Sequence, residues 1–233
     1  MFKFIRQVIS GAAVVSAALS PQAQAGTVPG VINFEGDALT GLYFPGDVFS
    51  QAGFAMSPDF DFGTIDKAPS LGAAAPSGNA TQFYFNSNDG GLSMQRSDGL
   101  AFNLDGFSAA FVPLIPGPNP DQNIVIVAIA FDMDNNFIFD FFSLGDTSAS
   151  APNSHPFITY NDPADFSQFS NLVFAEFFAC ALTPTTLCDP PTHNNAQFAI
   201  DDINVTVIPE PSTAARMALG LLGLALRRRR GIR

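Results

Sequence analysis

The sequence predicts an all-β protein, a jelly-roll-like sandwich of two β-sheets, flanked by an N-terminal signal peptide and a short C-terminal hydrophobic helix. Three observations support this prediction. Short segments rich in Phe, Val, Ile and Thr alternate with clusters of Gly, Asn, Asp and Pro, which is the pattern of strands and turns. No amphipathic helix pattern occurs between residues 26 and 207. The 25 Phe residues, with no Trp, provide large apolar rings for a core between two sheets.

The first 25 residues have the features of a secretory signal peptide. Lys3 and Arg6 supply the positive charge that precedes an apolar stretch at residues 8–19. A small-residue cleavage signal ends at Ala25, so signal peptidase is expected to cut before Gly26. The sequence therefore predicts an exported protein whose β-sandwich domain spans residues 26–207.

This predicted domain is strongly acidic. It holds 20 Asp and Glu residues, and its only Lys and Arg residues are Lys67 and Arg96, so its net charge is 2 − 20 = −18. Such a surface repels nucleic acid, and we exclude nucleic-acid binding for this reason. The same charge favours solubility and the binding of divalent cations.

Eleven segments of the domain are predicted to be strands. They are Val31–Glu35, Gln51–Ala55, Thr81–Asn86, Leu92–Gln95, Ala101–Leu104, Phe107–Val112, Asn123–Asp132, Phe137–Leu144, Phe157–Tyr160, Asn171–Ala179 and Gln197–Val207. The nearly continuous apolar run at residues 124–130 predicts a central strand covered on both faces. Hairpin turns are predicted at residues 88–91 and 134–136. The Pro- and Gly-rich segments 57–77 and 113–120 are predicted to be loops.

The last predicted strand contains an irregularity at two carboxylates. The apolar residues up to Ile200 and those from Ile203 onward have opposite parity, and the phase changes at Asp201 and Asp202. Because side chains alternate between the faces of a strand, one extra residue here would return all the apolar residues to one face. We therefore expect a β-bulge that changes the direction of the two carboxylates.

A second acidic segment, with Glu35 and Asp37, lies near the start of the domain. The two segments, NFEGD and FAIDDINV, resemble the ends of galactose-binding-like jelly rolls of carbohydrate-binding modules. In that family a structural calcium ion joins the two ends of the domain. The resemblance implies Glu35, Asp37, Asp201 and Asp202 as ligands of a structural Ca²⁺, which suits oxygen donors. The alternative is that these side chains are solvated carboxylates and turn formers.

The two cysteines of the chain, Cys180 and Cys188, are predicted to form a disulfide. They enclose a short Pro- and Thr-rich segment, and disulfides are favoured in an exported protein. Free thiols and a metal-binding pair are the alternatives.

The C-terminal segment, residues 208–233, combines three features: the motif Pro209-Glu210-Pro211, an apolar run that ends at Leu226, and the cluster Arg227-Arg228-Arg229-Arg230. The arginines would orient an apolar helix with its C-terminus in the cytoplasm. Together these features resemble the PEP-CTERM sorting signal of Gram-negative bacteria. The resemblance implies that the tail holds the precursor transiently in the inner membrane until an exosortase removes it. The body would then reach the cell surface or the extracellular matrix.

The sequence contains no catalytic motif, neither G-x-S-x-G nor H-E-x-x-H. We therefore expect an exported, non-enzymatic surface or matrix protein with a structural or adhesive role. The first alternative is a calcium-stabilised, lectin-like module that binds exopolysaccharide, for which Tyr43, Tyr84 or Tyr160 would be the exposed stacking platforms. A glycan hydrolase is the second alternative, and it would need two carboxylates that face each other in a cleft.

Overall fold

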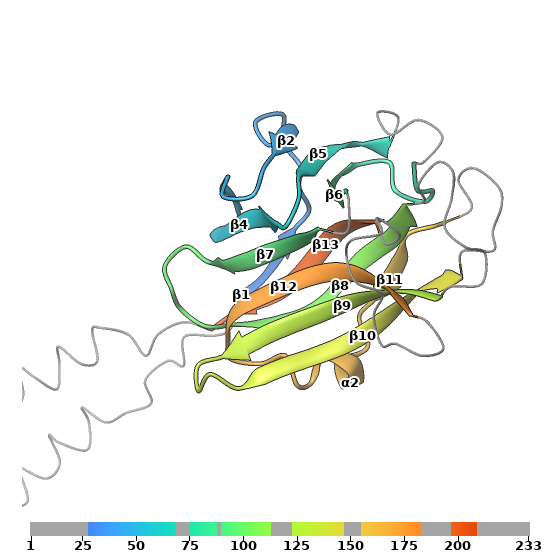
Figure 1. Cartoon of the computed structure of the whole chain (residues 1–233). Helices are drawn as coiled ribbons and strands as arrows, with labels where there is room; N and C mark the ends of the chain where they lie inside the picture. The colour runs from blue at the N-terminus through green and yellow to red at the C-terminus, as the bar shows by residue number, and fades with distance from the viewer. Residues whose placement is uncertain are drawn as a thin grey trace, which may run out of the picture. The chain divides into compact units, whose positions relative to one another are not determined.

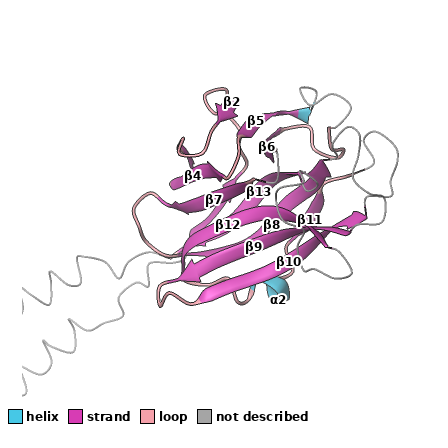
Figure 2. Ribbon diagram, in the orientation of Figure 1, coloured by secondary structure: helices cyan, strands magenta, loops and turns pink. Residues whose placement is uncertain are grey.

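The computed structural model describes residues 28–68, 75–87, 90–112, 123–146, 155–182 and 197–208. Within the range 28–208, which forms one compact unit, these residues build thirteen strands and one four-residue helix (Figure 1). In chain order they are β1 (Val28–Ile32), β2 (Gly41–Tyr43), β3 (Phe49–Gln51), β4 (Phe54–Asp59), β5 (Gly63–Lys67), β6 (Gln82–Asn86), β7 (Gly91–Arg96), β8 (Phe102–Val112), β9 (Asn123–Asp132), β10 (Phe137–Asp146), β11 (Ile158–Tyr160), α2 (Pro163–Phe166), β12 (Leu172–Leu182) and β13 (Gln197–Val207). Strands dominate the described residues, as the sequence predicts (Figure 2).

The strands form two antiparallel layers. The first sheet has the order β2-β5-β6-β13-β8, with β1 beside the second half of β13 and β11 beside β8. The second sheet has the order β10-β9-β12-β7-β4-β3. A single pair, Leu172 with Phe102, joins β12 to β8, so that the two layers are continuous along one curled sheet. From β7 to β13 the chain passes back and forth between the layers, which confirms the predicted jelly-roll-like sandwich.

The core between the layers is largely made of aromatic rings. Phe107 of β8, which is fully buried, packs edge-to-face on Phe142 of β10 and on Phe177 of β12, with ring centroids 4.9 and 5.2 Å apart. Phe166 of α2 lies 5.9 Å from Phe107 and stacks on Phe142, which explains why this short helix is held against the sandwich. Such pairs add to the large area that each ring buries.

Most predicted strands are confirmed, β9 and β13 with the predicted bounds, and four predictions are wrong. The strand predicted at Gln51–Ala55 is instead a hairpin turn, because β3 ends at Gln51 and pairs with β4, which begins at Phe54. Segment 57–77 is not all loop, because β4 continues to Asp59 and β5 occupies Gly63–Lys67. Residues 102–112 form one long strand, β8, instead of two. The turn at residues 88–91 does not close a hairpin, because β6 pairs with β5 and β13 whereas β7 pairs with β4 and β12.

Gly63 explains why β5 was missed. In a Pro- and Gly-rich segment a glycine favours a loop, yet here glycine is required by packing. A Cβ atom at this position would lie 2.1 Å from the hydroxyl oxygen of buried Tyr84. Ile65, two residues further, is fully buried on the same face, so the strand belongs to the core.

The predicted irregularity of β13 is present. The register of β13 against β8 shifts between Asp201 and Asn204, and Asp202 has a positive φ of 48°. The bulge places Ile200 and Ile203 in the same core, although their parity differs. Asp201 becomes buried on the opposite face, whereas Asp202 is exposed.

The described residues include no helix of the length and apolar character needed to cross a membrane. The predicted signal peptide, with its cleavage site at Ala25 and Gly26, and the predicted tail helix lie outside the described residues.

Candidate functional site

The most unusual surface feature is a row of exposed aromatic rings on strand β10. Phe137, Phe139 and Phe141 alternate along the strand on the outer face of the second sheet, with exposed fractions of 55, 49 and 38%. Neighbouring centroids in this row are 5.7 Å apart. Among the described residues, β10 pairs only with β9, so it is an edge strand, and the exposed fractions of its three rings show that its outer face is open to solvent.

The aromatic surface continues across the sheet. Phe131 of β9 lies opposite Phe137, with a centroid distance of 5.5 Å, and Phe174 of β12 lies opposite Phe131, at 6.2 Å. Residues opposite one another on adjacent strands share a face of the sheet. We call the five rings Phe131, Phe137, Phe139, Phe141 and Phe174 the aromatic band.

The same face becomes polar beyond β12. On the neighbouring strand β7, Gln95 lies beside Phe174. Two residues further along β12, Glu176 lies opposite Ser93 of β7, which in turn lies opposite Ser57 of β4. A shallow hollow of about 140 Å³ lies here, and it is lined by Val48, Ala55, Met56, Ser57, Ser93, Met94, Gln95 and Phe174. One ring of the aromatic band therefore forms a wall of a hollow that also presents hydroxyl and amide groups.

Glu176 of β12 lies between the aromatic and polar halves of this face. It reaches over Gly91 of β7 toward Asp59 of β4: a Cβ at Gly91 would lie 3.2 Å from Oε1 of Glu176 and 3.7 Å from Cβ of Asp59. Burial, and then repulsion by Asp59, raises the pKa of Glu176 to about 7. Oδ2 of Asp59 is buried and has no hydrogen-bond partner among the described residues.

The predicted calcium ligands are only partly brought together. Asp201 is 1% exposed, and its carboxylate accepts hydrogen bonds from Nδ2 of Asn79 (2.6 Å), Oγ1 of Thr81 (3.2 Å) and the backbone N–H of Asp202 (2.8 Å). Burial raises the pKa of Asp201 to about 7, although these hydrogen bonds oppose the shift. A buried carboxylate is thus satisfied by donors of the protein itself.

Glu35 contacts the same segment. Its Oε1 accepts the backbone N–H of Gln82 at 2.9 Å, one residue after Thr81. Asp37 and Asp202 are exposed. Within the described ranges, no three His, Cys, Asp or Glu side chains are grouped closely enough to hold a metal ion. The calcium ion therefore stays a prediction.

None of the three tyrosines forms the exposed platform considered for a lectin. Tyr84 is fully buried, the hydroxyl of Tyr43 donates to the Leu39 carbonyl, and that of Tyr160 donates to the Ser143 carbonyl. Phenylalanines form the exposed aromatic surface instead.

Of the other predicted site residues, all but Cys180 lie outside the described residues. Cys180 is buried on β12, and its predicted partner Cys188 lies outside the described residues, as do Pro209, Glu210, Pro211 and the four arginines at 227–230.

The sequence analysis missed the aromatic band because it assigned all phenylalanines to the core. A signal was nevertheless present in segment 137–144, where residues of both parities are apolar. For an edge strand of a two-layer sandwich, one of these parities must face solvent. Which strand lies at the edge depends on the pairing of distant segments, so the sequence pattern alone did not identify the exposed face.

Comparison with known proteins identifies the tail and the fold. Residues 207–230 match the PEP-CTERM protein-sorting motif, which indicates an exported, membrane-anchored precursor. No curated protein matches the chain. A DUF4465 family protein from Bacteroides caccae has a similar fold, with a TM-score of 0.54 and 12% identity over 76% of this chain and 98% of that chain.

Two solved carbohydrate-binding modules of family 22 are more distant in structure. They are the CBM22-1 xylan-binding domain of Paenibacillus barcinonensis Xyn10C (TM-score 0.36, 12% identity, 79% of this chain and 98% of that chain) and the C-terminal family 22 module of Clostridium thermocellum Xyn10B (TM-score 0.35, 12% identity, 81% and 98%).

Proposed function

We propose that this protein is an exported, non-enzymatic surface or matrix protein that binds extracellular polysaccharide through the aromatic band and the adjoining hollow. The observation that carries the proposal is the position of the exposed rings of β10 on the same sheet face as hydroxyl and amide groups of β4 and β7. An exopolysaccharide matrix is the setting in which such a protein would have its adhesive role.

The chemistry of this face suits a sugar chain. The C–H faces of a sugar ring pack on aromatic rings, whereas its hydroxyl groups need hydrogen-bond partners. Phe139 and Phe174 supply the aromatic rings. Ser57, Ser93 and Gln95 supply the hydrogen-bonding groups. Sites that combine an apolar surface with a few polar groups are typical of small-molecule and cofactor recognition.

Other ligands fit less well. A purely apolar partner, such as a lipid surface, would remove water from the side chains of Gln95 and Glu176 without offering hydrogen bonds in return, and each buried unsatisfied polar group costs about 1–3 kcal/mol. The domain charge of −18 disfavours polyanions, so we expect a neutral polysaccharide.

Addition of a strand from another molecule to β10 is also disfavoured. Asp140 accepts the backbone N–H of Phe141 at 2.8 Å through Oδ1 and the side chain of Gln168 at 2.9 Å through Oδ2. The Ser143 carbonyl accepts a hydrogen bond from Tyr160. Side chains therefore occupy polar groups of this edge, which is a way for natural sheets to avoid pairing.

A hydrolytic role has less support than binding. Glu176 and Asp59 are two carboxylates that approach each other at the proposed ligand face, yet Oδ2 of Asp59 is buried. A glycosidase needs two carboxylates that both reach the substrate. We therefore assign Glu176 to ligand contact rather than to catalysis.

Processing of the tail completes the proposal. The matched sorting motif at residues 207–230 supports an inner-membrane precursor from which an exosortase releases the body. Signal peptidase would remove residues 1–25 at the other end.

Binding to insoluble neutral polysaccharides, measured by depletion of protein from solution, tests the proposed ligand face. The double variant F139A/F141A should bind at least about tenfold more weakly than wild type, because stacking area is lost. Phe44→Ala is the matched control, since Phe44 is 53% exposed but follows β2 of the first sheet. Equal binding by F139A/F141A, or no binding by wild type to any polysaccharide, would contradict the proposal. Release of new reducing ends would instead indicate a hydrolase.

A further inference from the structure

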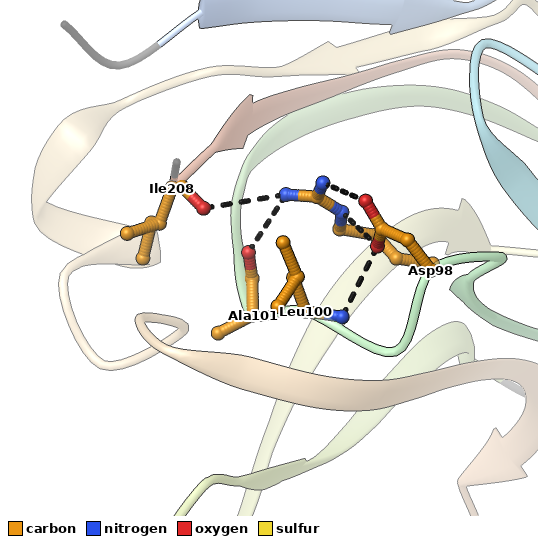
Figure 3. A network of polar contacts seen from close by, with 5 residues as sticks. Asp98, Leu100, Ala101 and Ile208 are labelled. Atoms are coloured by element: carbon orange, nitrogen blue, oxygen red, sulfur yellow. Dashed lines mark hydrogen bonds and ion pairs between the residues drawn. The ribbon is translucent and has the colours of Figure 1, made fainter. Parts of the chain in front are cut away.

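Arg96, at the end of β7, holds two distant parts of the chain together. Its side chain is only 9% exposed. Nη1 donates to the carbonyl of Ala101 at 3.2 Å and to the carbonyl of Ile208 at 3.4 Å, and Nε donates to Oδ1 of Asp98 at 2.9 Å (Figure 3). A second contact, from Nη2 to Oδ2 of Asp98, makes this pair bidentate.

Asp98 fixes the direction of the guanidinium group. Its Oδ1 also accepts the backbone N–H of Leu100 at 3.1 Å, so the carboxylate is itself held in place. The hydrogen bond from Arg96 lowers the pKa of Asp98 below its usual value. A bidentate pair of this kind has a defined geometry that a lysine cannot reproduce.

Ile208 is the residue directly before Pro209 of the sorting motif. Its N–H donates to the carbonyl of Ala101 at 3.4 Å, and its own carbonyl accepts the bond from Arg96. Both backbone polar groups of Ile208 are therefore bonded to the folded domain. The next residue, a proline, has no N–H to continue a ladder, so backbone pairing cannot extend unchanged into the motif.

Arg96 is a rare cation in an acidic domain. Within residues 26–207 the only Lys and Arg residues are Lys67 and Arg96, against 20 Asp and Glu residues. The single arginine of this acidic domain bonds the carbonyl directly before Pro209. The start of β1 lies at the same place, because Val28 pairs with Val207. Both ends of the domain therefore leave it side by side.

We propose that Arg96 is a positioning residue for removal of the tail, because it holds Ile208 at the edge of the sandwich. The processing enzyme then meets a folded body that ends at Ile208, in which the peptide bonds of β13 are paired with neighbouring strands. The inference rests on the proposed processing by an exosortase. Cleavage here is hydrolysis of one peptide bond C-terminal to Ile208, in which water adds hydroxyl to the new carboxyl group and hydrogen to the new amine.

Hydrogen exchange on the full-length chain tests whether Arg96 holds this junction. In Arg96→Gln the amide of Ile208 should exchange at least about tenfold faster than in wild type, while amides of β9 stay unchanged. Arg96→Lys should restore protection only in part, since one ammonium group cannot bond both carbonyls and Asp98. Asp47→Ala is the control: it removes a carboxylate that accepts the Phe44 N–H at 2.8 Å beside β2. Unchanged exchange at Ile208 in R96Q would overturn the inference.

Processing of the full-length chain in a host that has an exosortase tests the role itself. We expect wild type and D47A to release a body of one mass, with a single C-terminal residue after Ile208. R96Q should release bodies with several C-termini, or release them at least about tenfold more slowly. The same single terminus at the same rate in R96Q and wild type would overturn the role of Arg96, whatever exchange shows.

The two proposals fail in distinguishable ways. A wild-type chain that keeps its tail in this host contradicts exosortase processing and, with it, the role of Arg96 in processing. Hydrogen exchange still reports in that case whether the guanidinium holds Ile208.

Discussion

Glu176 and Asp59 approach each other over Gly91, which lies on the strand between theirs and has no side chain to separate them. Burial and the charge of Asp59 both disfavour the charged form of Glu176 in this position. This relationship makes the ligand face sensitive to pH, and the following predictions begin with it.

The free energy of unfolding should fall as pH rises from about 4.5 to about 7. The folded protein keeps the proton on Glu176 in this range, since its pKa is about 7, whereas the unfolded chain loses it near the ordinary value of 4.5. We expect a loss of about 1–2 kcal/mol, less than the full shift implies because the side chain is partly exposed. Urea unfolding of wild type and E176Q at pH 5 and pH 8 measures it.

Asp201 also contributes to the pH dependence of the free energy of unfolding. Its pKa is also raised to about 7, so it contributes a loss of the same sign. E176Q should therefore remove part of the pH dependence, and the double variant E176Q/D201N should remove more. Equal slopes for wild type and the double variant would contradict the assignment.

The predicted calcium ion is open to a direct test. If it joins Glu35 and Asp37 to Asp201 and Asp202, a concentration of Ca²⁺ about 100 times its Kd should add about 2.7 kcal/mol to the stability of the domain. Thermal unfolding in excess Ca²⁺ and in EDTA should show this difference, and Asp201→Ala should abolish it. Identical melting temperatures in the two conditions would argue that the hydrogen bonds to Asn79 and Thr81 complete this end of the domain without calcium.

Gly63→Ala should destabilise the domain by about 1–3 kcal/mol. The added Cβ would lie 2.1 Å from Oη of Tyr84, so the buried ring or β5 must move. Gly41→Ala is a matched control on the neighbouring strand, because its Cβ would meet nothing closer than Tyr43 at 4.0 Å. Chemical denaturation of both variants measures the difference, and similar stabilities would show that the Tyr84 contact is not limiting.

Phe107→Ala and Phe137→Ala should separate core rings from ligand-face rings. Removal of fully buried Phe107 should cost about 3–5 kcal/mol. Removal of Phe137, which is 55% exposed, should cost much less. Urea denaturation checks both values, and a large loss for F137A would mean that the aromatic band is mainly structural.

The Cys180–Cys188 disulfide also stays a prediction. Intact mass before and after alkylation under non-reducing conditions should show no free thiol. Cys188→Ser should lower stability by about 2–3 kcal/mol, the value expected for so short a loop. Alkylation of both cysteines without reduction would contradict the pairing.

The local sequence pattern was sufficient to predict those features of the fold that depend on interactions between residues close together in the chain. The continuous apolar run of β9 predicted a strand buried on both faces, and the phase change at Asp201 predicted a bulge, because side-chain alternation is a property of one strand. The turn at residues 134–136 was predicted for the same reason, and it is closed by a bond from Asn135 N–H to the Asp132 carbonyl. β5 was missed because its glycine, Gly63, is required by contact with a side chain distant in sequence, that of Tyr84.

The sequence by itself determined the all-β class, the acidic charge and the sorting motif of the tail, since these depend on composition and on contiguous residues. Only the tertiary structure decided that β10 is an edge strand, that Glu176 approaches Asp59, and that Arg96 reaches Ile208. Each of these joins segments separated by tens of residues or more, and the pairing that brings them together depends on how all strands fill two layers at once. No local pattern contains that information.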